Sequence, residues 1–180
     1  MSLKYSLLAL LSYGPSTGYD LHKMYPKPLR PTIGFIYRAL TAMAKEDLVE
    51  STRVNQEKRP DRNVFSLTEA GRAEFINWLS TPLHFKLPRN TIMVQLAFGK
   101  LIGKSAMIDN IRSHREEIRK TTLLFSDPKQ WDYVMGKKKK TAKAVGDPYL
   151  QLMYESSVEI LNLQIMWLDS IERKLLKIKE

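Results

Sequence analysis

The 180-residue sequence contains no cysteine. A disulfide scaffold, a thiolate zinc site and a cysteine nucleophile are therefore excluded. Long hydrophobic runs are also absent near the N-terminus, where the apolar residues 7–11 are too few to span a membrane. Gly14-Pro15 follows this run as a turn and offers no small-residue cleavage site for a signal peptide. These absences lead us to expect a cytoplasmic protein.

Acidic side chains are scarce relative to basic ones. The chain has 19 Asp and Glu against 29 Lys and Arg, which gives a formal net charge of +10. A basic chain favours a polyanionic partner, and nucleic acid first. Hydrophobic residues make up 43% of the sequence, so the chain has enough of them to bury a core.

The residue patterns of catalysis and metal binding are missing. His22, His84 and His114 are scattered, with no carboxylate partner at ligand spacing, so we predict no metal site. The sequence also lacks a nucleophile motif, a glycine-rich phosphate loop and a spaced pair of carboxylates. We therefore expect no cofactor and no enzymatic activity.

The first 46 residues predict three short helices with tight breaks. Apolar spacing predicts a helix over residues 3–13 and a second one capped by Thr17, with Asp20 three residues later as in a capping box. Thr32 is the expected cap of a third helix over residues 32–46. The predicted inner stripe of this helix is Ile33, Ile36, Tyr37, Leu40, Met43 and Ala44. Three such helices are typical of a helix-turn-helix unit.

The following segment predicts a β-hairpin and a fourth helix. Residues 48–54 and 63–67 are rich in β-forming residues and are separated by a polar, charged tip at residues 55–62. Thr68 is the expected cap of the fourth helix. Its predicted inner face consists of Ala70, Phe75, Trp78 and Leu79. This order of elements is that of a winged helix.

The second half of the chain is predicted to be helical. We expect an apolar helix over residues 90–102, a charged helix from Ser105, and an uninterrupted helix from Pro148 to about Lys179, while residues 126–146 fit either a helix or a loop. The last helix carries an apolar stripe longer than a small domain could cover, so we predict that a second copy of the chain covers it. The residues predicted to form this dimer contact are Val158, Leu161, Ile165, Leu168, Ile171 and Leu175.

The predicted fold class is therefore mainly α with a small β-hairpin. We assign residues 1–81 to a winged helix-turn-helix DNA-binding domain and residues 82–89, bounded by Pro82 and Pro88, to a linker. Residues 90–180 form a helical, coiled-coil-like dimerisation domain in this prediction.

The candidate DNA-contacting surface is the outer face of the third helix. This face consists of Gly34, Phe35, Arg38, Thr41, Ala42 and Lys45. Apart from Phe35, which is unusual at an exposed position, these residues are short or basic, as entry into a major groove requires. Arg38 could reach guanine or a phosphate, and Phe35 could touch a thymine methyl group or pack on the preceding loop. Tyr37 lies on the predicted inner stripe, so a core position is its first interpretation, although its hydroxyl could reach a phosphate.

The hairpin tip is a second candidate surface. Lys58 and Arg59 could contact phosphates or a narrow minor groove, but a solvated loop explains the tip equally well when it is taken alone. The four lysines at residues 137–140 are better explained as a solvated loop than as a further DNA contact.

Several motifs in residues 3–79 together resemble the PadR-type transcriptional regulators. They are residues 7–11, Gly14-Pro15, residues 18–21, residues 36–40, residues 48–50, residues 60–65 and residues 67–72, with Trp78-Leu79. The length and the helical C-terminal half resemble the virulence-activator, AphA-like, subgroup. The segment between Gly18 and Tyr37 is about four residues shorter than the usual pattern, so the resemblance does not fix the angle between the second and third helices or the groove contacts of Arg30 and Thr32.

The resemblance implies a non-catalytic, homodimeric winged-helix protein that binds double-stranded DNA and represses or activates transcription. We expect such a dimer to bind a pseudo-palindromic operator. Carried over to this sequence, it implies DNA contacts by Thr32, Phe35, Tyr37, Arg38, Lys58 and Arg59. Two other functions remain open. One is a winged-helix adaptor that binds protein. The other is a sensor of phenolic or drug-like molecules, with Trp131, Tyr154 and Trp167 as candidate stacking faces.

Overall fold

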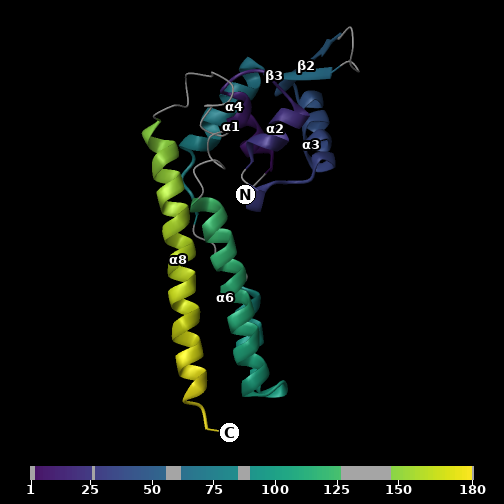
Figure 1. Ribbon diagram of the computed structural model, residues 1–180. Helices are drawn as coiled ribbons and strands as arrows, with labels where there is room; N and C mark the ends of the chain where they lie inside the picture. Colours follow the sequence, from purple (N-terminus) through teal and green to yellow (C-terminus); the bar gives the residue numbers. More distant parts are fainter. Residues whose placement is uncertain (1–2, 26, 56–61, 85–89, 127–146, 180) are drawn as a thin grey trace. The chain divides into compact units, whose positions relative to one another are not determined.

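The computed structural model describes residues 3–25, 27–55, 62–84, 90–126 and 147–179. These residues divide into an N-terminal unit that ends at Leu83 and a helical unit that begins at His84 (Figure 1). Asp147 groups with the first unit, and the chain from Pro148 onward groups with the second. Residues 127–146, where the sequence favoured neither helix nor loop, lie outside the described residues.

The N-terminal unit combines four α-helices with a small sheet, which is the predicted winged-helix order with one strand added. Its elements are α1 (Leu3–Leu11), β1 (Ser16–Thr17), α2 (Gly18–Met24), the 3-10 helix η1 (Lys27–Leu29), α3 (Ile33–Lys45), β2 (Val49–Val54), β3 (Arg62–Leu67) and α4 (Glu69–Ser80).

The added strand is β1, which pairs antiparallel with β3 and gives the strand order β1-β3-β2. In this pairing Thr17 lies opposite Val64, while Asn63 of β3 lies opposite Arg53 of β2. Since α2 begins at the residue after β1, the pairing fixes the start of α2 beside the base of the hairpin.

Side-chain caps and one left-handed residue define the helix ends. The Thr17 hydroxyl accepts from the backbone N–H of Asp20 (3.0 Å) at the start of α2, as predicted. At the end of α3, Asp47 has φ +56°, and the N–H of Leu48 reaches back to the carbonyl of Met43 at 2.9 Å. This is a Schellman ending with an aspartate at the position that usually holds glycine.

The N-terminal unit has one hydrophobic core, shared by its helices and sheet. Its buried members are Leu7, Leu8, Leu11, Leu21, Tyr25, Ile36, Leu40, Met43, Leu48, Val49 and Phe65. The predicted inner stripes were too wide, because Ile33 and Ala44 of α3 and Ala70 and Leu79 of α4 are exposed. On α4 the close contact is instead made by Gly71, where a Cβ would lie 2.0 Å from the Leu48 carbonyl oxygen.

The helical unit is built on two long antiparallel helices. Its elements are α5 (Thr91–Ala97), the 3-10 helix η2 (Gly99–Leu101), α6 (Lys104–Ser126) and α8 (Pro148–Leu176). Helices α6 and α8 lie side by side (Figure 1). Pro148 begins α8 as predicted, whereas the predicted helix over residues 90–102 is divided into α5 and η2. Within the described residues, no helix combines the length and the apolar character that crossing a membrane requires.

The apolar stripe of α8 packs against α6 of the same chain. The buried members of this second core are Ile92, Met107, Ile111, Ile118 and Leu168, with Leu161, Ile165, Ile171 and Leu175 packed against them. From the sequence alone, a second copy of the chain is predicted to cover this stripe. The structure gives most of it an intramolecular partner, while Val158 is half-buried outside this core and Ile178 lies exposed beyond the helix.

Candidate nucleic-acid interface

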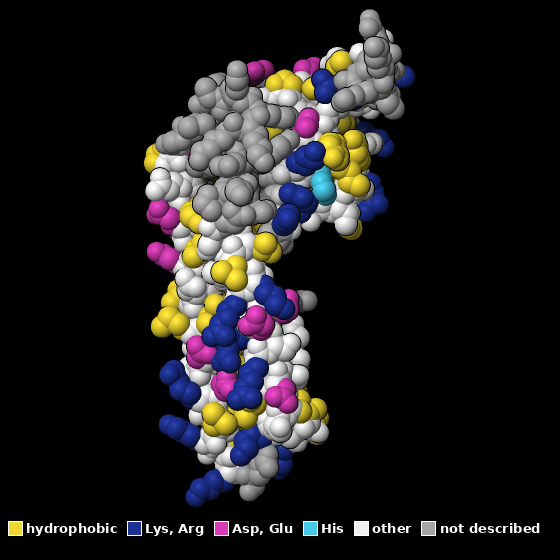
Figure 2. Space-filling model, in the orientation of Figure 1, with side chains coloured by type: hydrophobic (Ala, Val, Ile, Leu, Met, Phe, Trp, Pro, Cys, Tyr) yellow, Lys and Arg dark blue, Asp and Glu magenta, His cyan; other side chains and the backbone are white. Residues whose placement is uncertain are grey.

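Helix α3 presents one face to solvent and buries the other. Ile36, Leu40 and Met43 anchor it in the core. The predicted outer face is confirmed as exposed, and it consists of Gly34, Phe35, Arg38, Thr41, Ala42 and Lys45. Basic side chains gather around exposed hydrophobic ones over α2 and α3 (Figure 2). A helix held by its inner face and lined outside with small, basic and aromatic residues has the form of a recognition helix.

Thr32 occupies the N-cap position of α3, as predicted, but its side chain makes no capping hydrogen bond. It is extended (φ −64°, ψ 149°), and its carbonyl accepts from the N–H of Phe35 at 3.0 Å. The exposed hydroxyl is therefore not committed to the helix end and can donate to an external acceptor such as a phosphate oxygen.

Phe35 and Arg38 form a pair on the outer face of α3. The Arg38 guanidinium lies over the Phe35 ring, 4.5 Å from its centroid, while Phe35 remains 55% exposed. An aromatic face attracts a guanidinium and restricts its orientation. The sequence predicted that Phe35 touches a thymine methyl group or packs on the preceding loop. The contact with Arg38 was not predicted, because a sequence does not indicate which exposed ring will meet which cation.

Tyr37 is at the surface, so its predicted core position was wrong. Its side chain is 42% exposed and lies across Gly18 at the start of α2. A Cβ at Gly18 would come within 2.7 Å of the Tyr37 ring, so only glycine leaves room for this approach. The alternative interpretation, a hydroxyl near a phosphate, is the one compatible with this position.

Arg30 supports the short segment between α2 and α3. Its Nε and one terminal nitrogen donate to the Tyr25 carbonyl (3.1 and 2.9 Å), and that nitrogen also reaches the Lys23 carbonyl at 3.4 Å. Tyr25 is buried and shares a 2.6 Å hydrogen bond with Ser6, and burial raises the pKa of its hydroxyl. Arg30 thus ties the end of α2 to the following loop, a role that sequence reasoning missed because it depends on how residues 25–31 turn.

The hairpin tip lies outside the described residues, and with it Lys58 and Arg59. The structure does describe the strands that lead into and out of the tip. The last strand pair joins Val54 to Arg62, and the pair before it joins Arg53 to Asn63. Both arginines are exposed, so the base of the hairpin carries positive charge on the described strands.

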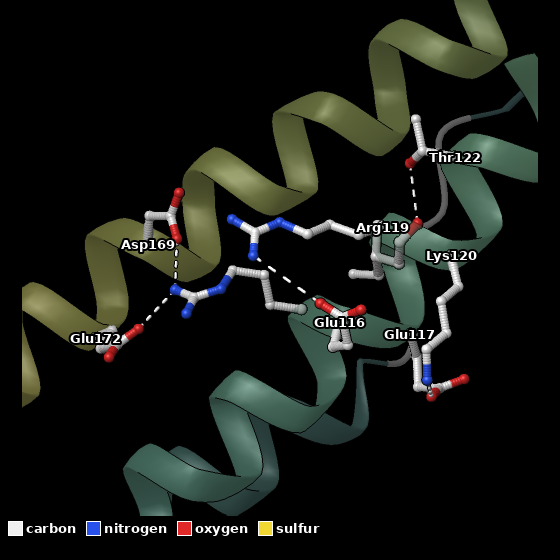
Figure 3. A network of polar contacts seen from close by, with 9 residues as sticks. Glu116, Glu117, Arg119, Lys120, Thr122, Asp169 and Glu172 are labelled. Carbon is white, nitrogen blue, oxygen red and sulfur yellow. Dashed lines mark hydrogen bonds and ion pairs between the residues drawn. The ribbon is translucent and has the colours of Figure 1, made fainter.

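In the helical unit, an ion-pair network joins α6 to α8. The Nε of Arg112 donates to Glu172 at 2.7 Å, and one nitrogen of Arg115 pairs with both Asp169 and Glu172. Both α8 carboxylates point toward this guanidinium (Figure 3). Hydrogen bonds from Arg112 and then from Arg115 hold the pKa of Glu172 below its ordinary value. The network fixes how the two helices face each other.

A groove of about 900 Å³ runs along the other flank of this helix pair. Its apolar lining comes from Ile92, Ile118, Ile160, Leu163, Trp167 and Leu168, and its polar lining includes Asn90, Gln95, Asn110, Ser113, His114, Glu117 and Gln164. Of the three candidate aromatic residues, Trp167 lines this groove, Tyr154 does not, and Trp131 lies outside the described residues. Among the residues whose placement is described, no three His, Asp or Glu side chains gather as a metal site would require.

The fold and this surface together define a winged helix-turn-helix protein with a helical C-terminal unit. Residues 7–77 match the family model "Transcriptional regulator PadR-like family". This match covers less than half of the chain, and over it the sequence is similar to the PadR-like family of transcriptional regulators, in agreement with the motifs of residues 3–79.

The chain is also similar to one curated relative and to two proteins of known structure. The probable transcriptional regulator Rv1176c of Mycobacterium tuberculosis is 33% identical over 87 residues, which are 46% of each chain, so the match spans about half of that relative. Bacillus subtilis PadR in complex with operator DNA has a TM-score of 0.75 at 18% identity, with coverage of 96% of this chain and 98% of that one. The same protein in complex with p-coumaric acid gives 0.70 at 18% identity, covering 97% and 99%.

The virulence activator AphA of Vibrio cholerae has a TM-score of 0.70 at 22% identity, and the match covers 97% of this chain and 98% of AphA. At such identities the likeness to PadR and AphA shows a shared fold over nearly the whole chain. It does not distinguish the AphA-like subgroup from the rest of the family.

Proposed function

We propose that this protein is a sequence-specific regulator of transcription that binds double-stranded DNA as a homodimer. The observation that carries the proposal is the exposed face of α3, with its basic and aromatic side chains beside the hairpin. We expect the protein to act in the cytoplasm, as a transcriptional regulator of the bacterial type would. Whether such a regulator represses or activates depends on where its operator lies relative to the promoter.

In this proposal the helix over residues 32–46 enters the major groove. Arg38 donates to guanine O6 and N7, and Phe35 holds it at the base edges. Thr32 and Tyr37 donate to backbone phosphates. Lys58 and Arg59, in the wing over residues 55–62, contact the backbone or the minor groove.

The homodimer is proposed to form through the helical unit. The stripe Leu161–Leu175 packs on α6, so a second copy would meet the adjacent row of exposed apolar residues along the groove: Ile160, Leu163 and Trp167. Two reading helices would then lie about 34–36 Å apart, or a multiple of this, on successive faces of a pseudo-palindromic site. The long helical C-terminal half is the feature that favours the AphA-like subgroup.

The test is DNA binding by an Arg38→Ala variant. A duplex enriched by selection from a random library and an unselected duplex of equal length serve as cognate and control DNA. We expect Arg38→Ala to reduce discrimination between them by about 1–3 kcal/mol. Arg72→Ala, which removes an exposed arginine from α4, should leave discrimination unchanged.

Two results of that test would change the role assigned to Arg38 or the partner assigned to the winged helix. An equal loss on both duplexes would make Arg38 a phosphate contact. If no sequence can be enriched and the wild-type protein gives only weak, sequence-blind retardation, the winged helix is an adaptor for protein partners.

A second function, response to a phenolic or drug-like ligand, is favoured by the groove in the helical unit. It offers Trp167 as a stacking face beside the amides of Asn110 and Gln164, which suits a small aromatic molecule with polar substituents. The complex of Bacillus subtilis PadR with p-coumaric acid gives the first compound to try. We expect p-coumaric acid to change the fluorescence of Trp167, and Trp167→Phe to remove that change. No response at millimolar ligand would count against this function.

A further inference from the structure

An open hollow lies where α2, α3 and the base of the hairpin meet. It has a volume of about 680 Å³ and is lined by Thr17, Tyr19, Asp20, Tyr37, Arg53, Arg62 and Asn63. None of these residues belongs to the outer face of α3. All lie in the N-terminal unit.

The sheet register explains why these residues share one place. Thr17 pairs with Val64, and Asn63, the next residue along β3 toward the tip, pairs with Arg53. The start of α2 therefore lies beside the part of the hairpin that carries Arg53 and Arg62. Tyr37 approaches from α3 because Gly18 leaves room for its ring.

The charges and donors of the hollow suit an anion. Among the described lining residues, Arg53 and Arg62 carry positive charge and Asp20 carries a carboxylate, which accepts a hydrogen bond from the Thr17 hydroxyl at 2.9 Å. Lys23 does not line the hollow, but its ammonium lies 4.2 Å from the centroid of the ring of Tyr19, which does. The phenol hydroxyl of Tyr37 and the amide of Asn63 can both donate to an anionic oxygen.

The shape and position of the hollow favour a DNA phosphodiester over a small free anion. The hollow is open to solvent and larger than one phosphate group, so part of a sugar–phosphate backbone can lie in it. Tyr37 directly precedes Arg38, which places the hollow beside the surface that faces DNA in the proposed function.

We propose that this hollow seats one backbone phosphodiester of the bound duplex, held by Arg53, Arg62 and the hydroxyl of Tyr37. The inference rests on the proposed function. It adds a sequence-independent anchor that fixes the register of α3 in the groove, because phosphate contacts position a protein on DNA whereas base contacts specify the sequence.

The experiment compares Arg62→Gln with Arg72→Gln, which removes the same charge from an exposed site on α4 outside the hollow. Binding is measured over a salt series on two duplexes of about 30 base pairs, one selected and one of random sequence. The slope of log affinity against log salt should fall by about one in Arg62→Gln on both duplexes. Arg72→Gln should keep the wild-type slope.

A second measurement locates the phosphate. Single methylphosphonates, which remove one backbone charge, are scanned along the selected duplex. One position in each half-site should weaken the wild-type protein and have no further effect on Arg62→Gln. Tyr37→Phe, which removes only the hydroxyl, should lose about tenfold in affinity on both duplexes. Equal thermal unfolding of the variants and the wild type confirms that each is folded.

The outcomes separate this inference from the proposed function. If the wild-type protein binds neither duplex, the proposed function is wrong, and so is the proposed phosphate-binding site. If the wild-type protein binds but Arg62→Gln and Tyr37→Phe both behave like Arg72→Gln, the hollow does not bind a backbone phosphate, although the protein does bind DNA. If inorganic phosphate displaces the random duplex far better than chloride at equal ionic strength, the hollow is a small-anion site instead.

Discussion

At the scale of single residues, the stacking of Arg38 on Phe35 turns an exposed aromatic ring into a support for a base contact. Phe35→Leu keeps an apolar side chain but removes the ring face. We expect discrimination between selected and random duplexes to fall about two- to fivefold, since an exposed cation–π contact contributes about 0.5–1 kcal/mol.

The control for Phe35 is a double-mutant cycle with Arg38→Ala, which measures the coupling between the two side chains. Phe35→Leu should have little effect once Arg38 is absent. Independent effects of the two substitutions would instead assign Phe35 a contact of its own with DNA.

Asp47 at the end of α3 gives a prediction about stability. A non-glycine residue at φ +56° is strained, and glycine at this position of a Schellman ending is not. Asp47→Gly should therefore raise the free energy of unfolding by about 0.5–1 kcal/mol, measured by urea denaturation. The Thr68 hydroxyl donates to the backbone carbonyl of Asp47 at 2.6 Å, so the substitution preserves this bond. A loss of stability would show that the carboxylate has a structural role.

Sequence reasoning identified the outer face of α3 correctly and misplaced Tyr37 for one physical reason. Helical spacing indicates which residues share a face, but it does not indicate how wide the covered part of that face is. The neighbouring α2 begins with Gly18, and its missing side chain lets the Tyr37 ring lie at the surface. Arg30 was missed for a related reason, because its partners are the backbone carbonyls of Lys23 and Tyr25.

At the scale of elements, the pairing of α6 with α8 combines an apolar seam with a charged flank. Glu172 is the centre of this flank, since it accepts from both Arg112 and Arg115. Glu172→Gln should lower the melting temperature at neutral pH. Glu116→Gln, which removes an exposed carboxylate 4.0 Å from Arg119, should change stability by no more than about 0.5 kcal/mol.

The lowered pKa of Glu172 predicts that the stability of the protein depends on pH. Hydrogen bonds from Arg112 and Arg115 lower the pKa of Glu172 in the folded protein, so its ionised form is favoured by folding. Its contribution to stability is present above the ordinary glutamate pKa and is lost as the pH falls through the lowered value. The melting temperatures of wild type and Glu172→Gln should therefore converge in acid. A difference that stays constant over this range would contradict the assignment.

Most elements were predictable from sequence because each carries local signals: the Thr17 and Thr68 caps, the proline at the start of α8 and the β-rich runs of the hairpin. The strand β1 was not, since two residues are too few for a periodic pattern and its partner, β3, lies about 47 residues further along the chain. The partner of the α8 stripe was also missed. The apolar stripe indicated that α8 must pack against another helix. Only the structure shows that most of this stripe packs against α6 of the same chain.

At the scale of the whole molecule, the proposed function depends on two copies coming together through the groove of the helical unit. Leu163 lines this groove and is 62% exposed. Leu163→Glu would place a charge in the proposed contact, where burying it without a partner is costly. We expect the dissociation constant of the dimer to rise at least about tenfold, as measured by sedimentation equilibrium. Affinity for a two-half-site duplex should fall toward that for a single half-site, since the two reading helices would no longer be linked.

Leu79→Glu is the matched control, because Leu79 has almost the same exposure, 61%, but lies on α4 in the N-terminal unit. This variant should dimerise and bind DNA like the wild type. If Leu163→Glu dimerises normally and Leu79→Glu does not, the interface lies on the winged-helix unit and not along the groove. If the wild-type protein is itself a folded monomer at micromolar concentration, the paired arrangement of two reading helices is wrong, and Arg38 would then read a single half-site.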